Sequence, residues 1–253
     1  MCMCWQLLFF FPLSIYGIGG RRRRGLMMKH KGIISLFIVG LLIMAYPHMA
    51  QIMNSYFQKN QVEEFQSGLG DLSDDEINEL MERAQSCNKE IYYDLNGFRD
   101  PWGDNQEKLT AFNDCLGLDD DEIFGAIEIP KLKLMIPIYL GASEEVLSKG
   151  IGQVEGSSLP LGGTNTHTVL AGHRGMGTKE MFRNIDELNE GDIFYILTMN
   201  ETLTYRVMNQ EVIYPHETDS LEIVEDKDLA TLLTCHPYRH NYQRLLIHGE
   251  RDE

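Results

Sequence analysis

A cysteine, a histidine and an arginine each stand at the boundary of a short apolar run in this chain. The run 231–234 ends at Cys235, and Arg244 opens the next run nine residues later. Upstream, the run 168–172 leads to His173. A thiol nucleophile, an imidazole that carries protons and a permanent cation that stabilises an oxyanion are the groups that cysteine-based acyl transfer requires.

The ordinary alternative for Cys235 is a buried structural cysteine, because free cysteines often pack as small apolar residues. However, the segment His236-Pro237-Tyr238 ends the run directly after it. A cysteine at the end of a strand lies beside a loop and is accessible, so we interpret Cys235 as the nucleophile. His236 is a poor base for it, because adjacent residues of a strand point to opposite faces.

His173 and Arg244 each have a competitor nearby. His167 lies in the same segment as His173 and is the alternative imidazole. Arg239 lies in a polar loop, where a solvated side chain is expected, whereas Arg244 begins a β-like run. The remaining histidines of the C-terminal part are interpreted as polar surface groups: His216, His240 and His248.

These residues resemble the signature of the sortases, the surface transpeptidases of Gram-positive bacteria. The family's Thr-Leu-any-Thr-Cys strand, its later arginine and its Gly-His-Arg segment have counterparts at 231–235, Arg244 and 172–174. The segment Asp100-Pro101-Trp102 is similar to the lid motif of the pilus-assembling class C enzymes. The likeness covers about residues 123–251.

The resemblance implies an eight-stranded β-barrel and a reaction without a cofactor. Cys235 would attack the threonine carbonyl of a Leu-Pro-any-Thr-Gly sorting signal, with His173 moving protons and Arg244 holding the oxyanion or the signal backbone. In class C enzymes a pilin lysine then attacks the thioester. As the lid, Asp100 would pair with Arg244 and Trp102 would lie against Cys235, both in place of substrate.

Three rival functions remain open on the sequence. An anchoring sortase would use amines of peptidoglycan cross-bridges as acceptors. A thiol hydrolase would resolve the acyl-enzyme with water. A membrane-tethered, acidic binding module would form no covalent adduct on Cys235.

The elements that would position these residues are short β segments after a helical N-terminal part. Alternation and apolar runs predict strands at 123–129, 134–140, 168–172, 193–198, 202–208, 212–214, 229–235 and 244–249. This pattern predicts a mostly β fold, either a barrel or a sandwich. A capping-box pattern at Ser73 and Glu76 predicts a helix over 74–87, and an earlier helix is expected through Glu64.

Charge and hydropathy indicate a membrane-anchored extracellular protein. The first 50 residues hold six basic residues and no acidic one, which leaves 16 of the 22 basic residues against all 38 acidic ones. So acidic a surface repels nucleic acid, which excludes that class of partner. The apolar stretch that follows Lys31 is long enough to cross a bilayer, and the preceding basic residues predict a cytoplasmic N-terminus. A cleaved signal peptide is the alternative.

We therefore expect five segments along the chain. Residues 1–28 form a leader and basic cytoplasmic segment, and residues 29–53 a single-pass transmembrane signal-anchor. A helical stem follows at 54–92 and a lid-bearing segment at 93–121, before the catalytic β-barrel at 122–253.

The other cysteines and histidines show no metal-binding spacing. Neither Cys-any-any-Cys nor His-Glu-any-any-His occurs, so no metal site is expected. Cys87 and Cys115 bracket the lid-like segment. An oxidising exterior would permit a disulfide bond between them, and the sequence leaves this open.

Overall fold

A computed structural model describes residues 24–70, 72–93, 100–102, 116 and 122–252. The chain divides into two compact units, Met1–Tyr46 and Pro47–Glu253. The described part of the first unit is helical, and the second unit holds the β structure and the predicted site.

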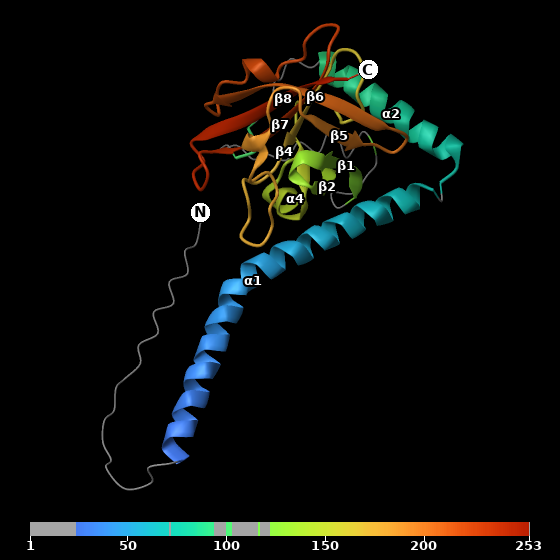
Figure 1. The fold of residues 1–253 in the computed structure, drawn as a ribbon. Helices are drawn as coiled ribbons and strands as arrows, with labels where there is room; N and C mark the ends of the chain where they lie inside the picture. Colours follow the sequence, from blue (N-terminus) through green and yellow to red (C-terminus); the bar gives the residue numbers. More distant parts are fainter. Residues whose placement is uncertain (1–23, 71, 94–99, 103–115, 117–121, 253) are drawn as a thin grey trace. The chain divides into compact units, whose positions relative to one another are not determined.

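Eight strands of the described residues close into a barrel in the order β1-β2-β3-β4-β7-β8-β6-β5 (Figure 1). They are β1 (Ile123–Ile129), β2 (Leu134–Leu140), β3 (Ile151–Gln153), β4 (Thr166–Ala171), β5 (Ile193–Leu197), β6 (Thr202–Ile213), β7 (Asp228–His236) and β8 (Gln243–Arg251). Two neighbouring pairs, β2 with β3 and β4 with β7, run parallel, and the others run antiparallel. The eight-stranded barrel that the resemblance implied is confirmed.

The barrel interior is apolar, so the apolar side chains of each strand determine which of its two faces points inward. On β7 and β8, Leu232 and Ile247 point into the main core and are fully buried. Their neighbours Leu233 and Leu246 belong to a second cluster on the outer face. Burying a side chain of this size stabilises the fold by about 1.5–3 kcal/mol. The apolar pattern therefore strongly specifies which residues of these strands point into the barrel. Cys235 lies two residues from Leu233, so its side chain points outward as well.

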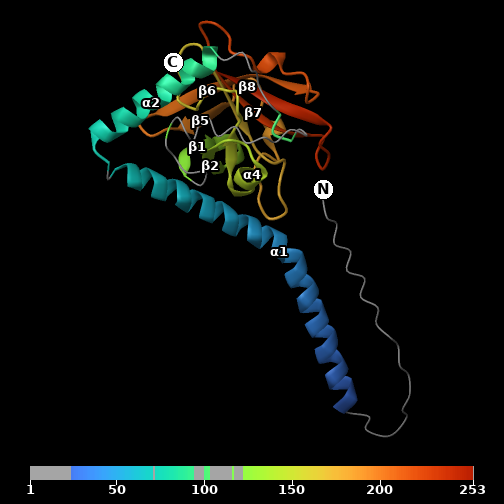
Figure 2. The ribbon, with the colours of Figure 1, turned by 180° about the vertical axis from the view of Figure 1, so that it is seen from behind.

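Two helices of the second unit pack on the barrel (Figures 1 and 2). The C-terminal part of α1 (Arg24–Leu69) contributes Val62 to a cluster with residues of β1 and β5. Asn88 of α2 (Asp74–Tyr93) accepts a hydrogen bond of 2.6 Å from the amide of Leu159. These contacts explain why α2 extends past the predicted end at 87, because it buries an apolar face against the barrel.

The capping box at the start of α2 is confirmed. The backbone amide of Ser73 donates to a carboxylate oxygen of Glu76 at 2.9 Å, and the amide of Glu76 donates back to the Ser73 hydroxyl at 3.3 Å. Cys87 on the same helix is buried and disulfide-bonded. Cys115, which the sequence leaves open as a partner for Cys87, lies outside the described residues, as do residues 1–23 of the predicted leader 1–28 and most of the lid-bearing segment.

Between residues 123 and 251 the observed elements include three further differences from the prediction. The two predicted segments 202–208 and 212–214 form one strand, because a register shift between Val207 and Asn209 lets β6 bend while it stays paired with β8. The short strand β3 was missed, since three residues are too few to show alternation. The helix α4 (Glu144–Lys149) was also missed, although the Ser143 hydroxyl caps it by accepting from the Val146 amide.

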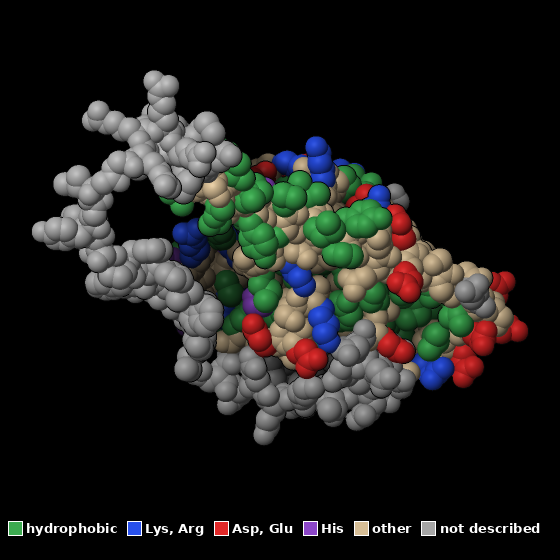
Figure 3. All heavy atoms as spheres, turned by 90° about the horizontal axis from the view of Figure 1, so that it is seen from below, with side chains coloured by type: hydrophobic (Ala, Val, Ile, Leu, Met, Phe, Trp, Pro, Cys, Tyr) green, Lys and Arg blue, Asp and Glu red, His purple; other side chains and the backbone are tan. Residues whose placement is uncertain are grey.

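The helix α1 runs without interruption through Pro47, so the predicted anchor and the first stem helix form one element. Among the described helices, the one over Gly32–Leu69 is long enough, and contains a window apolar enough, to cross a membrane by length and composition. Its apolar side chains are exposed along the helix. Figure 3 shows hydrophobic side chains among those at the surface of the chain. One apolar N-terminal helix therefore fits a membrane anchor.

Candidate active site

Cys235 and Arg244 are direct partners across the antiparallel ladder of β7 and β8. Side chains directly opposite each other in such a ladder share a face, with Cβ atoms about 4.5–5.5 Å apart. The thiol is partly buried, and Cys235 is the free cysteine of the described residues. The Arg244 side chain is 3% exposed. The predicted thiol and the predicted cation therefore lie side by side.

His173 reaches the same row from β4. Ala171 pairs with Leu233 in the parallel β4–β7 ladder, and the amide of Gly172 extends the ladder by donating to the Leu233 carbonyl at 3.0 Å. Two residues beyond this pair, the two strands carry His173 and Cys235. His173, Cys235 and Arg244 thus come from three neighbouring strands at one edge of the barrel.

The end of β4 is shaped by Gly172. A Cβ atom at this position would lie 2.6 Å from a methyl group of Ile151 and 2.8 Å from the ring of Phe182. Such contacts are shorter than packed atoms allow, so a side chain here would displace the strand end. The backbone carbonyl of His173 also accepts from the Phe182 amide at 3.0 Å. The glycine therefore lets β4 approach its neighbours closely enough to present His173.

Both reactive groups are held in their neutral form in this arrangement. Burial raises the pKa of the Cys235 thiol to about 11, an effect that Arg244 opposes and Asp100 reinforces. Burial also lowers the pKa of His173, against the influence of the Glu144 carboxylate. At neutral pH the thiol is therefore protonated and the imidazole uncharged.

Asp100 forms a bidentate ion pair with Arg244. Nε and Nη2 of the guanidinium donate to the two carboxylate oxygens of Asp100, each at 2.6 Å. Both side chains are largely buried, with 3% of Arg244 and 9% of Asp100 exposed. The pairing that the resemblance implied is present. The carboxylate occupies the donors that an oxyanion would need.

Trp102 covers the same region. The Arg244 guanidinium carbon lies 5.0 Å from the centre of its ring, and the His173 ring centre lies 6.2 Å away. The indole packs against the outer apolar cluster that includes Leu233 and Leu246. Pro101, between the two, is buried. The described part of the lid-like segment therefore contacts Arg244 and lies beside His173, and the expected contact of Trp102 with Cys235 stays a prediction.

Sequence reasoning missed a carboxylate beside the imidazole. An oxygen of Glu144 lies 3.6 Å from Nε2 of His173. Glu144 opens α4, directly after the capping residue Ser143. In sequence it reads as an ordinary first-turn acid, and only the packing of α4 beside β3 and the end of β4 brings it to the site.

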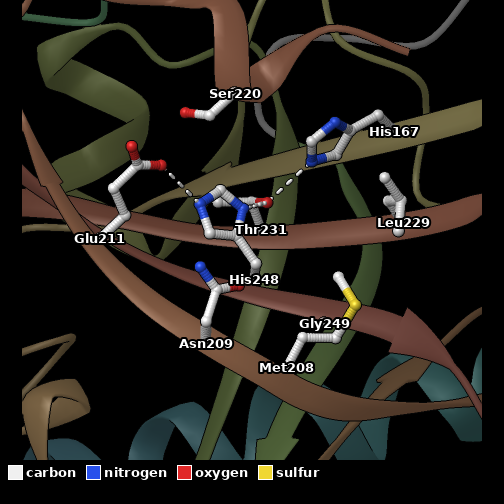
Figure 4. Close-up of a pocket in the computed structure, with 9 residues that line it drawn as sticks. All are labelled: His167, Met208, Asn209, Glu211, Ser220, Leu229, Thr231, His248 and Gly249. Carbon is white, nitrogen blue, oxygen red and sulfur yellow. Dashed lines mark hydrogen bonds and ion pairs between the residues drawn. The ribbon is translucent and has the colours of Figure 1, made fainter. Parts of the chain in front are cut away.

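His167, the alternative imidazole, is not part of this arrangement. It is buried and its Nε2 lies 2.7 Å from the hydroxyl of Thr231, which in turn lies 2.9 Å from Nδ1 of His248 (Figure 4). His248 Nε2 lies 3.2 Å from a carboxylate oxygen of Glu211. The interpretation of His248 as a surface group was wrong, because 7% of it is exposed.

These groups line a hollow of about 220 Å³ between β6, β7, β8 and the connection from β6 to β7 (Figure 4). Because a carbonyl can only accept, His167 donates through Nδ1 to the Glu222 carbonyl at 2.8 Å, and its Nε2 then accepts from Thr231. The two histidines of the hollow therefore use their ring nitrogens in hydrogen bonds within the protein. The hollow is separate from the candidate site, because Thr231, which lines it, precedes Cys235 by four residues on β7.

The other competitors lie in loops. Arg239 is exposed and its guanidinium lies 5.4 Å from the ring centre of Tyr238. His216 and His240 are exposed as expected. Within the described residues, no group of three or more histidine, cysteine or acidic side chains is arranged to hold a metal ion.

Comparison with known proteins decides the family. The family model described as "Sortase domain" matches residues 127–252. The chain is 36% identical to a solved sortase C of Streptococcus pneumoniae, with a TM-score of 0.71, and the match covers 77% of this chain and 97% of that one. The chain belongs to the sortase family.

Other sortases show the same likeness. A pilus-related sortase C of Group B Streptococcus is 38% identical with a TM-score of 0.70, over 76% of this chain and 97% of that one. Sortase D of Bacillus subtilis (strain 168) is 30% identical over 130 residues, which are 50% of this chain and 63% of that sortase. The chain thus spans less than two thirds of this curated relative. The resemblance to class C sortases is confirmed.

Proposed function

We propose that the chain is a membrane-anchored cysteine transpeptidase that acts on sorting signals of the Leu-Pro-any-Thr-Gly type. It cleaves the signal between threonine and glycine and joins the acyl group to a pilin lysine. The proposal is supported by one observation above all. Cys235, His173 and Arg244 stand in one row across β7, β4 and β8, beneath an acidic side chain that occupies the guanidinium.

In the first half-reaction the Cys235 thiol, which is neutral in the closed site, gives its proton to His173, and the resulting thiolate attacks the threonine carbonyl carbon. The carbonyl electrons move to oxygen, and the guanidinium of Arg244 stabilises the negative charge. The carbon–nitrogen bond then breaks, and His173 gives its proton to the departing glycine amine. A threonyl thioester on Cys235 remains, with His173 now neutral.

In the second half-reaction a lysine amine attacks the thioester carbonyl. His173 accepts the proton that the amine loses, and the tetrahedral intermediate collapses with release of the Cys235 thiolate. The product is an isopeptide bond between the threonine of one protein and the lysine of another. The enzyme returns with the thiolate and the imidazolium that formed when Cys235 gave its proton to His173.

The closed arrangement is the resting state of this enzyme. Asp100 and Trp102 form a lid that substrate displaces, since the donors of Arg244 and the surroundings of the thiol are occupied while they are in place. Displacing Asp100 removes a negative charge that raises the pKa of Cys235 and lets solvent reach the thiol. Opening therefore favours the thiolate as well as access to it.

The anchor would hold the catalytic unit at the outer face of the membrane. Residues 29–53 lie in the apolar part of α1, and basic residues precede them. Surface proteins that carry a sorting signal next to the membrane would then meet the enzyme in the same layer. The partners we propose are pilins with sorting signals.

The experiment is to incubate the full chain in detergent micelles with a sorting-signal peptide and a lysine-bearing pilin. We expect a mass increase on Cys235 equal to the peptide up to its threonine, release of the glycine fragment, and a lysine-dependent ladder of linked pilins. Cys235→Ala should keep the barrel folded, by circular dichroism, and show neither adduct nor ladder.

The outcomes separate the rival functions. A ladder that persists when the pilin lysine is replaced contradicts the proposed acceptor, and transfer only to cross-bridge amines identifies an anchoring enzyme. Release of the acyl fragment as a free acid, unchanged by added amine, identifies a hydrolase. No adduct on Cys235 with any signal peptide leaves only the binding-module alternative.

A further inference from the structure

Arg174 and His236 directly follow the two residues that the proposed reaction uses, His173 and Cys235. His236 is the last residue of β7, so alternation places its side chain on the face opposite the thiol. There Nη1 of Arg174 lies 2.7 Å from Nδ1 of His236. One hydrogen bond therefore joins the neighbour of the imidazole to the neighbour of the nucleophile.

Asp186 holds the same guanidinium from the other side. Its carboxylate lies 2.8 Å from Nη2 of Arg174, whose side chain is only 7% exposed. Asp186 stands on the short helix η2 (Ile185–Glu187), which follows Phe182, the residue whose amide donates to the His173 carbonyl. Arg174 thus connects the end of β7 to the segment that already holds the backbone of His173.

The hydrogen bond also defines the protonation state of His236. A guanidinium can only donate, so Nδ1 of His236 must accept and the ring must be neutral, with its proton on Nε2. Burial lowers the pKa of His236, and the charge of Arg174 acts in the same direction while Asp186 opposes it. The contact is therefore intact at neutral pH. The positive charge of Arg174, on the opposite face of β7, also lowers the pKa of the Cys235 thiol.

We propose that Arg174 is a positioning residue that ties His236 to Asp186 and thereby holds the thiol of Cys235 and the imidazole of His173 at their working separation. This inference rests on the proposed function, because it assigns Arg174 a part in presenting the same two groups. In this role the Arg174 side chain makes no contact with substrate. Its effect acts on the chemical step, since misplacing reacting groups by about 1 Å can cost 100-fold in rate.

The first test compares Arg174→Gln and Arg174→Lys with the parent chain in the peptide-transfer reaction. We expect kcat to fall about tenfold or more in both variants with KM within about twofold, because neither side chain spans both partners. The pH midpoint of Cys235 alkylation by iodoacetamide should rise in Arg174→Gln, which loses the cation, and stay near the parent value in Arg174→Lys. The alkylated Cys235 peptide is quantified by mass spectrometry.

The second test changes the other end of the contact. His236→Asn keeps a hydrogen-bond acceptor near the position of Nδ1, whereas His236→Ala removes it. We expect His236→Asn to retain most of the parent kcat and His236→Ala to lose about as much as Arg174→Gln. A purely structural role predicts equal kcat for the two His236 variants once both are folded.

An unchanged kcat in folded Arg174→Gln overturns the proposal, even if its melting temperature falls. Should Arg174→Gln fail to fold, the two His236 variants decide, and equal kcat values overturn it. If the parent chain transfers no peptide at all, the proposed function fails instead. In that case the positioning role falls with the reaction on which it rests, and the alkylation midpoint, which needs no substrate, still tests whether the charge of Arg174 lowers the pKa of Cys235.

Discussion

All three nitrogen atoms of the Arg244 guanidinium donate hydrogen bonds while Asp100 and Trp102 cover the site. Nε and Nη2 donate to Asp100, and Nη1 donates to the carbonyls of Asn241 and Gln243 at 2.7 and 3.0 Å. The two backbone contacts fix the plane of the guanidinium and leave its other edge for a carboxylate or a developing oxyanion. In the proposed reaction, substrate would therefore compete with Asp100 for the same two donors.

The lid makes a direct prediction for Asp100→Ala and Trp102→Ala. A charge-assisted hydrogen bond contributes about 1.5–3 kcal/mol, so losing it should speed alkylation of Cys235 about 10- to 100-fold at fixed pH. Asp100→Ala should also lower the pH midpoint of alkylation, because Asp100 raises the pKa of the thiol. The measurement is the alkylation rate of the Cys235 peptide by mass spectrometry.

The matched control is Asp75→Asn, which changes an exposed acid in the first turn of α2. Its alkylation rate should equal that of the parent chain. Parent-like rates in both Asp100→Ala and Trp102→Ala would rule out the lid.

Arg244→Lys and Arg244→Ala test the oxyanion role. Removing one donor to an oxyanion commonly costs 100- to 1,000-fold in kcat, about 2.7–4 kcal/mol, and we expect a loss of that order for Arg244→Ala. Arg244→Lys keeps the charge but not the fork of donors, so it should recover only part of the loss. Steady-state transfer of a signal peptide is the measurement.

Arg239→Ala serves as the matched control, because Arg239 is exposed in the neighbouring loop. Its kcat should stay within about twofold of the parent value. A comparable loss in Arg239→Ala, or none in Arg244→Ala, would contradict the assignment.

At the scale of elements, the parallel pairing of β4 with β7 builds the site. Their ladder runs from Thr166 opposite Asp228 to Ala171 opposite Leu233, and the Thr234 hydroxyl donates to the Gly172 carbonyl at 2.7 Å where the regular ladder ends. Both strands therefore deliver their last residues to the same edge of the barrel. An antiparallel pairing would have placed His173 and Cys235 at opposite ends.

The hydrogen-bond network of His167, Thr231 and His248 ties the same strands together four residues away from the site. His167 is 1% exposed, and its Nδ1 donates to the Glu222 carbonyl in the connection between β6 and β7. Glu211 on β6 faces the other end of the network. A charge on His167 would break the hydrogen bond that its Nε2 accepts from Thr231, so the neutral ring is part of the fold.

Because His167 is buried in its neutral form, we expect the folded protein to lose stability in acid. Burial lowers the pKa of His167 to about 4 from an ordinary value of 6.5. Between these values the unfolded chain binds the extra proton, so the free energy of unfolding should fall as the pH drops from 6.5 toward 4, by on the order of 3 kcal/mol. Urea denaturation at a series of pH values in detergent micelles measures it.

His167→Gln removes the titrating group and is the comparison for this effect. Its acid limb should be shallower than that of the parent chain, although His248, whose pKa burial also lowers, still contributes. Equal acid slopes in the two proteins would show that His167 does not control this range.

At the scale of the whole molecule, an apolar helix and an acidic β unit are combined in one chain. The basic residues of the first 50 positions and the acidic balance of the rest predict opposite sides of a membrane for the two ends of α1. The acidic surface also disfavours adsorption to anionic membrane lipids. The catalytic unit is therefore expected to be held near the membrane by its helix and not by surface charge.

Protease treatment of intact protoplasts tests this orientation. With the catalytic unit outside, added protease should remove an epitope tag placed after Glu253 and spare one placed before Met1. The reverse pattern would contradict the orientation, and lysed protoplasts, in which both tags are accessible, are the control. The folded barrel resists cleavage, so the tags are joined through flexible linkers.

How far the sequence predicts the fold depends on whether the signal is local. The strands around Cys235 and Arg244 were predicted within one to two residues, because alternation and turn residues act within a few positions. The bend of β6 and the short β3 were missed, since a register shift and a three-residue bridge exist only through their partners.

By itself the sequence determined the chemical groups at the site and the phase of the strands that carry them, because residue type and two-residue periodicity are properties of a single segment. Only the tertiary structure decided which groups meet. Glu144 and Arg174 became neighbours of the site through packing. The ion pair of Asp100 with Arg244 joins positions 144 residues apart, and only the family resemblance, not a pattern in the segments themselves, implied it. Such contacts form when barrel closure buries charges that must then be paired, and no local pattern encodes that requirement.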